Sequence, residues 1–213
     1  MADAPPQPRH RWFAALYDRM DRSSDRRMQA LRRRLLGGVS GRVLEIGCGT
    51  GNSFEHYDWS QIASVDATEP DPFMLHRALE KAARLGGAVG AKLTLTEAPA
   101  EALPFPEAAF DFVISSLVLC SVADPARALA EIRRVLKPGG ELRLLEHVAA
   151  EGAWRTVQGA VQAPYGWLSA GCRLDRRTED AVREAGFALE VWERVSFSPL
   201  HPAVLGVGRK APS

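Results

Sequence analysis

Two carboxylates and three glycines near the start of the chain have the types and spacing of a binding site for a small ligand. The segment at 42–57, RVLEIGCGTGNSFEHY, is an aliphatic run with Glu45 near its end, followed by Gly47, Gly49 and Gly51. Glycines lack the Cβ that would keep a ligand away from the backbone, and they adopt positive φ without strain. We therefore expect a ligand to lie against the bare backbone of this turn, with the N–H groups of the helix that follows pointing at an anionic group of the ligand.

The glycine spacing and Glu45 together disfavour the nucleotides that such turns often bind. The loop lacks the Lys-Ser/Thr pair of a P-loop, so a triphosphate is not expected. Its spacing is G-x-G-x-G, whereas dinucleotide-binding turns have G-x-G-x-x-G, which argues against an NAD-dependent dehydrogenase. A carboxylate at Glu45 would repel a pyrophosphate and suits a ligand that carries positive charge.

A second carboxylate lies where a ribose diol is often bound. Glu69 ends a strand-like run and follows Gly51 by 18 residues (69 − 51). In doubly wound folds an acidic residue at about this distance binds the ribose hydroxyls. Asp66 is an alternative at 15 residues (66 − 51). We favour Glu69 because Pro70 and the start of a helix follow it directly.

The elements that position these residues alternate between strands and helices. Helical periodicity is clearest at 72–85 and 125–136, and the strand-like runs before, between and after these helices lie at 42–46, 62–69, 92–96, 110–116 and 141–146. This alternation predicts right-handed crossovers and a parallel sheet with helices on both faces. A helix at 176–186 precedes two further runs, at 187–195 and 203–209, which predict an antiparallel edge hairpin. The predicted fold class is α/β, a doubly wound, mostly parallel seven-stranded sheet.

The chain is expected to form a single domain over 1–213, since no repeat or linker divides it. Residues 1–38 predict an N-terminal helical cover, whose second helix has arginines at 26–34 that form a solvated face or meet a membrane or an anion. Residues 147–175 predict an inserted helical flap, in which Trp154, Tyr165 and Trp167 either line an apolar pocket or pack the flap.

The composition excludes several classes of protein. It is 46% apolar and 25% charged, and Lys+Arg 27 against Asp+Glu 26 leaves a net charge of +1, so no nucleic-acid partner is expected. No run of 18 apolar residues occurs and no signal peptide is evident, so stable membrane insertion is not expected. Cys48, Cys120 and Cys172 form neither a CxxC pair nor a zinc spacing, which predicts small buried thiols, a cytoplasmic location and no metal.

Four motifs follow one another at the spacing of a known family. They are VLEIGCGTG (43–51), the acid Glu69, AEALPFPEAAFD (100–111) and RRVLKPGGEL (133–142). Together they resemble the motifs of class I S-adenosylmethionine-dependent methyltransferases, over about residues 40–146. The resemblance implies S-adenosylmethionine as the cofactor, with S-adenosylhomocysteine as its product.

The resemblance also implies which residues bind the cofactor. Glu45 and the turn would hold the ammonium and carboxylate of the methionine moiety, and Glu69 would hold the ribose. Ala100 and Glu101 would face the adenine, although Pro99 stands where many relatives have an acid, so adenine recognition is looser here or comes from elsewhere. The full set of expected contacts is Tyr17, Glu45, Gly47, Cys48, Gly49, Gly51, Asn52, Glu69, Pro70, Ala100, Glu101, Ser116 and Leu117.

A narrower resemblance concerns the methyl acceptor. The stretches SSLVLCSV (115–122), EHVAAE (146–151) and GCRLDRRTEDAVREAGF (171–187) are similar to those of the animal methyltransferase-like thiol S-methyltransferases, without the N-terminal membrane anchor of those enzymes. His147 is the candidate catalytic residue, as a base or as a positive charge that favours a thiolate, or it anchors the flap. Cys120 stands where many relatives have histidine, and no covalent role is expected for it.

The function predicted from these resemblances is methyl transfer to a small-molecule acceptor, with a thiol as the leading class. A thiol ionises readily, with a pKa of about 8.5, so a modest base suffices. The alternatives are phospholipid N-methylation, quinone or natural-product O- or C-methylation, and a non-catalytic regulator that binds the cofactor. We expect a monomer or a weak dimer.

Overall fold

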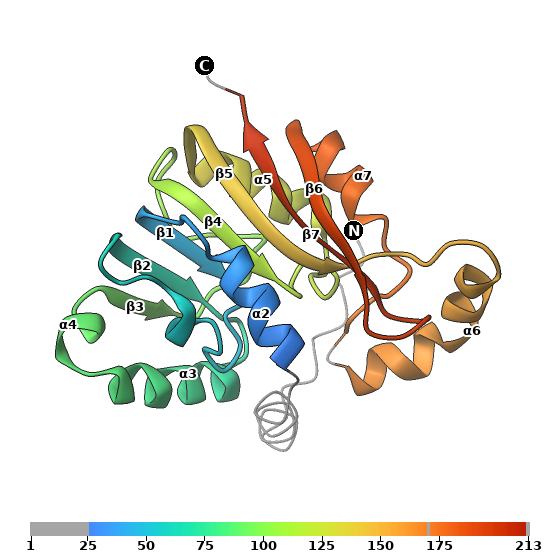
Figure 1. The fold of residues 1–213 in the computed structure, drawn as a ribbon, viewed down its shortest axis with the longest axis horizontal. Coiled ribbons are helices and arrows are strands. Elements are labelled where there is room, and N and C mark those ends of the chain that lie inside the picture. Colours follow the sequence, from blue (N-terminus) through green and yellow to red (C-terminus); the bar gives the residue numbers. More distant parts are fainter. Residues whose placement is uncertain (1–25, 170, 212–213) are drawn as a thin grey trace.

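The computed structural model describes residues 26–169 and 171–211, which form a seven-stranded sheet with helices on both faces (Figure 1). The strand order is β3-β2-β1-β4-β5-β7-β6. The first five strands are parallel, β7 is antiparallel to β5, and β6 is antiparallel to β7 at the edge. This confirms the predicted fold class. The strands are β1 (Gly41–Ile46), β2 (Ile62–Thr68), β3 (Leu93–Thr96), β4 (Phe110–Ser116), β5 (Leu136–His147), β6 (Phe187–Ser196) and β7 (Pro202–Lys210).

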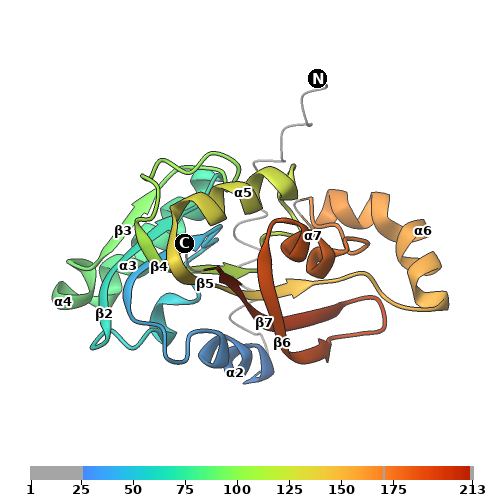
Figure 2. The same ribbon diagram turned by 90° about the horizontal axis from the view of Figure 1, so that it is seen from above.

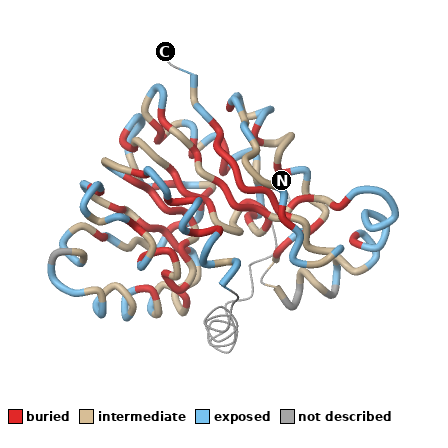
Figure 3. The backbone as a smooth tube through the Cα atoms, in the orientation of Figure 1, coloured by how far each residue is buried: buried red, intermediate tan, exposed pale blue. Residues whose placement is uncertain are grey.

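The helices cover the sheet in two layers, with α5 and α7 on one face and α2 on the other (Figure 2). Successive side chains of a strand point to opposite faces of the sheet. In β1, Leu44 therefore packs with α5 and α7, whereas Val43 beside it packs with α2 and α3. The central strands are accordingly buried along most of their length (Figure 3). The helical elements are α2 (Arg26–Leu35), η1 (Phe54–His56), α3 (Pro72–Leu85), α4 (Gly87–Gly90), α5 (Pro125–Val135), α6 (Ala153–Leu168) and α7 (Thr178–Glu184).

Two capped helix starts fix the loops at the carboxyl edge of the sheet. The Asp71 carboxylate accepts hydrogen bonds from the backbone N–H groups of Phe73 and Met74 at 2.8 and 3.2 Å, and Pro72 occupies the first turn of α3. Asp124 caps α5 in the same way, with Pro125 after it. Both caps stand directly after loops that leave a parallel strand, so they set where those loops end.

Three local features differ from the sequence-based expectations. The glycine turn leads into the short 3₁₀ helix η1, not into an α-helix, so no N-terminus of an α-helix faces a ligand there. β5 begins at Leu136, directly after α5, because Leu136 already pairs with Phe110 of β4, and the register shifts before Glu141, where Gly139 has a φ of 74°. Arg32 of the arginine-rich helix is buried, whereas the other arginines at 26–34 are exposed.

Among the residues that the structure describes, no helix has the length and apolar character needed to cross a membrane.

Candidate functional site

The glycine turn lies at the point where the sheet changes direction. β1 has β2 on one side and β4 on the other, so the turn after β1 opens into the crevice where doubly wound folds bind ligands. Gly47, Gly49 and Gly51 have φ values of 54°, 57° and 76°. An added Cβ would lie 2.8 Å from Val118 at Gly47 and 2.4 Å from Phe54 at Gly51. Gly47 and Gly51 are therefore required by the packing of the turn itself.

Glu69 lies against this turn. It is 6% exposed, its Oε2 accepts a hydrogen bond from the backbone N–H of Gly49 at 2.8 Å, and its Oε1 accepts one from Asp71 at 2.9 Å. The rival acid, Asp66, is instead paired with Arg42 of β1 at 3.6 Å. Of the two acids, only Glu69 contacts the glycine turn among the described residues. This geometry supports Glu69 as the residue that binds a diol beside the turn.

Burial raises the pKa of Glu69 to about 7, and the two backbone hydrogen bonds only partly offset this effect. The ionised carboxylate accepts hydrogen bonds from both hydroxyls of a diol, whereas the protonated acid has lost one acceptor. The charged form therefore binds better, and it is populated as the pH rises through the pKa. Affinity for an adenosyl ligand is expected to rise with pH across this range.

The expected size of this pH effect follows from the fraction ionised. With a pKa of about 7, that fraction rises from roughly 10% at about pH 6 to roughly 90% at about pH 8, so the affinity for S-adenosylhomocysteine should rise about tenfold. Calorimetric titrations at both values measure it. The variant Glu69→Gln, which cannot ionise, should show a flat profile, and a flat profile for the unaltered protein would refute the role of Glu69.

Glu45 is buried beneath the turn. It is 2% exposed, and its Oε2 accepts a hydrogen bond from the hydroxyl of Tyr57 at 3.0 Å. Burial raises the pKa of Glu45, while the hydrogen bonds from Ser53 and Tyr57 lower it. The carboxylate thus tethers the segment that follows the turn, and a cationic ligand group would have to reach it from the edge of the sheet.

Three buried hydroxyls line the same edge. Among the described residues, the side-chain oxygens of Thr50, Thr68 and Ser116 are buried without a hydrogen-bond partner. They lie in the glycine turn, at the end of β2 and at the end of β4. Leu117, the next residue, has a φ of 60°, a strained value for a leucine that is typical of functional sites. A polar, bare and strained edge of this kind fits a ligand with hydroxyl, carboxylate and ammonium groups.

The remaining expected contacts are placed as follows. Ala100 is buried, and Glu101 accepts hydrogen bonds through its Oε1 from the backbone N–H groups of Ala123 and Asp124 at 2.8 and 3.2 Å. Its carboxylate therefore holds the loop before α5, and only its backbone is left to face an adenine. Cys48 is buried in the turn and Pro70 is exposed beside Glu69, whereas Tyr17 lies outside the described residues.

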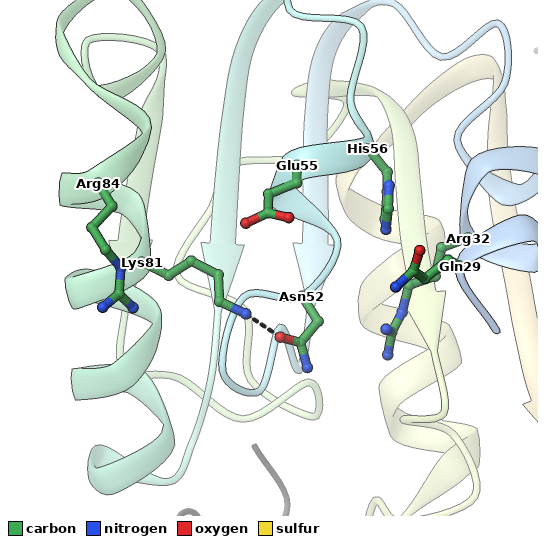
Figure 4. A pocket seen from close by; sticks show the side chains of 7 residues that line it. All are labelled: Gln29, Arg32, Asn52, Glu55, His56, Lys81 and Arg84. Carbon is green, nitrogen blue, oxygen red and sulfur yellow. Dashed lines mark hydrogen bonds between the residues drawn. The ribbon is translucent and has the colours of Figure 1, made fainter. Parts of the chain in front are cut away.

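A cavity of about 510 Å³ lies behind the glycine turn, between α2 and α3 (Figure 4). The Asn52 side chain accepts a hydrogen bond there from the ammonium of Lys81 on α3 (Figure 4). Asn52, which directly follows Gly51, is one of its lining residues, so the cavity borders the glycine turn. Its lining is strongly charged and consists of Gln29, Arg32, Asn52, Glu55, His56, Lys81 and Arg84.

His147 lies at the end of β5, and we call the rings around it the acceptor side because the sequence predicts the acceptor there. Its ring contacts those of Phe197 and His201, with centroids 6.3 and 5.8 Å away, and His201 in turn contacts Tyr165 of α6 at 5.2 Å. Trp154 is 48% exposed near the start of α6, and the side chain of Trp167 lies outside what the structure describes. The acceptor side is thus built from histidine and aromatic rings of β5, α6 and the β6–β7 connection.

Glu146 and Cys172 are two residues of this side whose contacts the sequence analysis missed. The Glu146 carboxylate is fully buried and accepts four hydrogen bonds. One comes from Ser115 Oγ of β4 at 2.7 Å, and three come from the N–H groups of Val118, Leu119 and Cys120 in the β4–α5 loop at 2.9 to 3.3 Å. Burial raises the pKa of Glu146, and these hydrogen bonds act against that rise. Cys172 lies 3.5 Å from Cys120, sulfur to sulfur. The sequence feature that could have indicated a buried, hydrogen-bonded Glu146 is a carboxylate at the end of a largely aliphatic strand.

Comparison with known proteins agrees with this geometry. Residues 44–144 match the family model described as a methyltransferase domain. The chain is 33% identical to human thiol S-methyltransferase TMT1B over 92% of this chain and 84% of the relative. The chain belongs to the class I S-adenosylmethionine-dependent methyltransferases. Within that class it is related to the TMT1 thiol S-methyltransferases.

Other methyltransferases are similar to a smaller extent. A phosphatidylethanolamine N-methyltransferase from Cereibacter sphaeroides is 33% identical over 75% of each chain. The structure of phosphoethanolamine N-methyltransferase 2 from Haemonchus contortus, in complex with S-adenosyl-L-methionine, superimposes with a TM-score of 0.66 at 19% identity, covering 87% of this chain and 52% of the other. That structural likeness shows the shared fold.

Proposed function

We propose that this chain transfers the methyl group of S-adenosylmethionine to the sulfur of a small thiol. The observation that carries the proposal is the 33% identity to human thiol S-methyltransferase TMT1B over nearly the whole chain. The N-methyltransferase relative is equally identical but matches a smaller part of this chain, 75% against 92%. The additional matched length favours the thiol as the acceptor.

The described residues divide the work between holding the cofactor and receiving the acceptor. When bound, S-adenosylmethionine supplies a methyl carbon made electrophilic by the sulfonium. Glu69 would hold the ribose, and the backbone of the glycine turn would hold the amino-acid end, so that the methyl group faces the ends of β4 and β5. Orientation of the two reactants is the main requirement of a displacement of this kind.

The acceptor side suits a thiol better than an alcohol. His147 and His201 give it two imidazoles, and the aromatic rings of Phe197 and Tyr165 give it apolar surface. An alcohol would need a strong, positioned base, whereas a thiol needs only a group that favours its thiolate. We assign this task to His147. Three unpaired cysteines fit a reducing compartment such as the cytoplasm.

The expected result is S-methylation of small thiols in the presence of S-adenosylmethionine, detected by mass spectrometry. Matched pairs, in which a thiol and an alcohol share one carbon skeleton, separate sulfur from oxygen as the acceptor atom. Methylation of the alcohols or of amines, with no thioether product, would contradict the proposal. A chain that binds the cofactor but methylates none of these acceptors would also contradict it and would favour a regulator.

Phospholipid N-methylation is the second candidate, supported by the Cereibacter sphaeroides relative. The exposed arginines of α2 at 26–34 would meet an anionic membrane surface. Incubation with S-adenosylmethionine and vesicles that contain phosphatidylethanolamine and an anionic lipid, followed by mass spectrometry of the lipids, distinguishes the two. Methylated lipid in that assay, without methylated thiol in the first, would replace the thiol proposal.

A further inference from the structure

Three donor atoms from distant parts of the chain converge beside the acceptor side. They are the sulfurs of Cys120, in the β4–α5 loop, and of Cys172, after α6, and the Nδ1 of His147 at the end of β5. The sulfurs are 3.5 Å apart, and Nδ1 lies 3.9 Å from Cys120 and 3.6 Å from Cys172. Both cysteines are buried, 1% and 6% exposed, and neither forms a disulfide.

These separations are those of ligands around one tetrahedral ion. With Zn–S of about 2.3 Å and Zn–N of about 2.0 Å, tetrahedral angles place two sulfurs about 3.8 Å apart and a sulfur and a nitrogen about 3.5 Å apart. The observed distances differ from these values by a few tenths of an ångström. Two thiolates and an imidazole are also the donor set that zinc prefers. We propose that Cys120, His147 and Cys172 bind a Zn²⁺ ion.

The backbone around each donor is fixed, as a metal site requires. The N–H of Arg173 donates to the carbonyl of Cys120 at 2.7 Å, which joins the two cysteine segments directly. Gln162 of α6 donates through Nε2 to the carbonyl of Cys172 at 3.0 Å. His147 is paired with Ala203 of β7, and the hydroxyl of Thr178 donates to its carbonyl at 3.1 Å. The three donors are thus held by contacts from α6, α7 and β7 and by a direct bond between the two cysteine segments.

The charges around the cluster also suit a cation with two thiolates. Two thiolates neutralise Zn²⁺, and the remaining charges nearby are one of each sign. The buried Glu146 holds the Cys120 loop through its backbone N–H groups. The guanidinium of Arg176 donates to the carbonyls of Leu119 and Val122, on either side of Cys120. A site that is neutral as a whole avoids the cost of burying a net charge.

A disulfide between the two cysteines explains less of the geometry. The sulfurs would have to close from 3.5 Å to about 2.05 Å, with loss of two electrons to an oxidant. A disulfide would also not explain why the imidazole of His147 lies beside both sulfurs. The metal accounts for all three donors, although the sequence spacing of the cysteines shows no zinc motif.

A tetrahedral ion with three protein ligands has one further position, and a small thiolate is a ligand that it takes. This consequence rests on the proposed function. The acceptor thiol would replace a water molecule on the metal and lose its proton to solvent. Its sulfur would then form the bond to the methyl carbon as the carbon–sulfonium bond breaks, with that electron pair left on S-adenosylhomocysteine, and the neutral thioether would leave the metal. His147 would act in this scheme as a ligand.

Metal content of the purified full-length chain tests the site without any need for turnover. After equilibration with Zn²⁺ under reducing conditions and removal of free metal, plasma mass spectrometry should find one zinc per chain. Cys120→Ser, Cys172→Ser and His147→Gln should each lower the retained zinc at least tenfold. Cys48→Ser and His76→Gln are matched controls, since Cys48 lies in the glycine turn and His76 is exposed on α3, and both should retain it.

The absorption spectrum of the Co²⁺-loaded protein gives a readout that does not depend on the folding of a variant. Two thiolate ligands should produce sulfur-to-cobalt charge-transfer bands, with the intense visible bands of tetrahedral cobalt. Addition of 2-mercaptoethanol should shift the visible bands as it enters the fourth position. Unshifted bands would contradict the open position.

Four other results would overturn the metal site. They are absence of zinc from the unaltered protein, equal zinc in all variants, iron in place of zinc, and a Cys120–Cys172 disulfide in metal-free protein. These measurements use no S-adenosylmethionine, so a failure here leaves the proposed methyl transfer untouched. Conversely, methylation of oxygen only would refute the thiol acceptor while a zinc result stood.

Discussion

Replacing Glu69 by alanine is expected to weaken the affinity for S-adenosylhomocysteine about 100-fold. The carboxylate would accept hydrogen bonds from two ribose hydroxyls, and a hydrogen bond to a charged group contributes about 1.5–3 kcal/mol. Two such bonds amount to about 3 kcal/mol at the lower limit, and every 1.4 kcal/mol is about tenfold in affinity. The same change removes the acceptor that holds the N–H of Gly49, which loosens the turn. Isothermal titration calorimetry measures the loss.

The control for this prediction is the neighbouring acid on the same strand. Asp66→Ala removes a carboxylate that is paired with Arg42 away from the turn, so the affinity should change by less than about threefold. Thermal melts of both variants show whether the fold is retained. Equal losses of affinity in the two variants, or an unchanged affinity in Glu69→Ala, would show that the ribose is bound elsewhere.

Replacing Glu146 by glutamine is expected to lower the free energy of unfolding by about 3 kcal/mol. The carboxylate accepts four hydrogen bonds, and a glutamine amide turns one of these acceptors into a donor that faces the N–H of Cys120. Relief of the buried charge offsets part of the loss, because burial penalises an ionised carboxylate. The loss comes from the N–H of Cys120, which then faces a donor, and from the three remaining bonds, which an uncharged oxygen accepts more weakly than a carboxylate, at about 1.5–3 kcal/mol for a bond to a charged group.

Urea unfolding followed by circular dichroism measures this change, which corresponds to a fall in Tm of about 6–12 °C for a chain of this size. Glu190→Gln is the matched control, because its exposed pair with Arg209 should contribute less than about 1 kcal/mol. If the two variants were equally stable, the carboxylate of Glu146 would not be the anchor of the β4–α5 loop.

The sheet was predictable from the sequence because its signals are local. Buried parallel strands are short aliphatic runs, and each lies next to a turn or a capped helix, such as the one that begins with Asp71 and Pro72. The edge hairpin followed from two apolar runs with a short connection. The 3₁₀ helix η1 after the glycine turn was not predictable, since the short GNSFEHY stretch has no clear hydrophobic period. The position of Phe54 is fixed instead by packing against Gly51.

The site was predictable only where its residues lie within one motif. Glu69 could be chosen by its distance from the glycines, and the structure places it against them. The role of Glu101 could not be predicted from the sequence, because its carboxylate accepts a hydrogen bond from Ala123, in the loop before α5. The contact of Cys120 with Cys172 joins residues 52 positions apart through α6, and no pattern along the chain encodes a contact of that range.

The structure of the complex with S-adenosylhomocysteine tests the central claim most directly. Both ribose hydroxyls should lie within about 3 Å of the Glu69 carboxylate, the amino-acid end should lie on Gly47–Gly51, and the sulfur should face the ends of β4 and β5. An adenosyl group bound instead in the charged cavity of Arg32, Lys81 and Arg84, with Glu69 untouched, would contradict it.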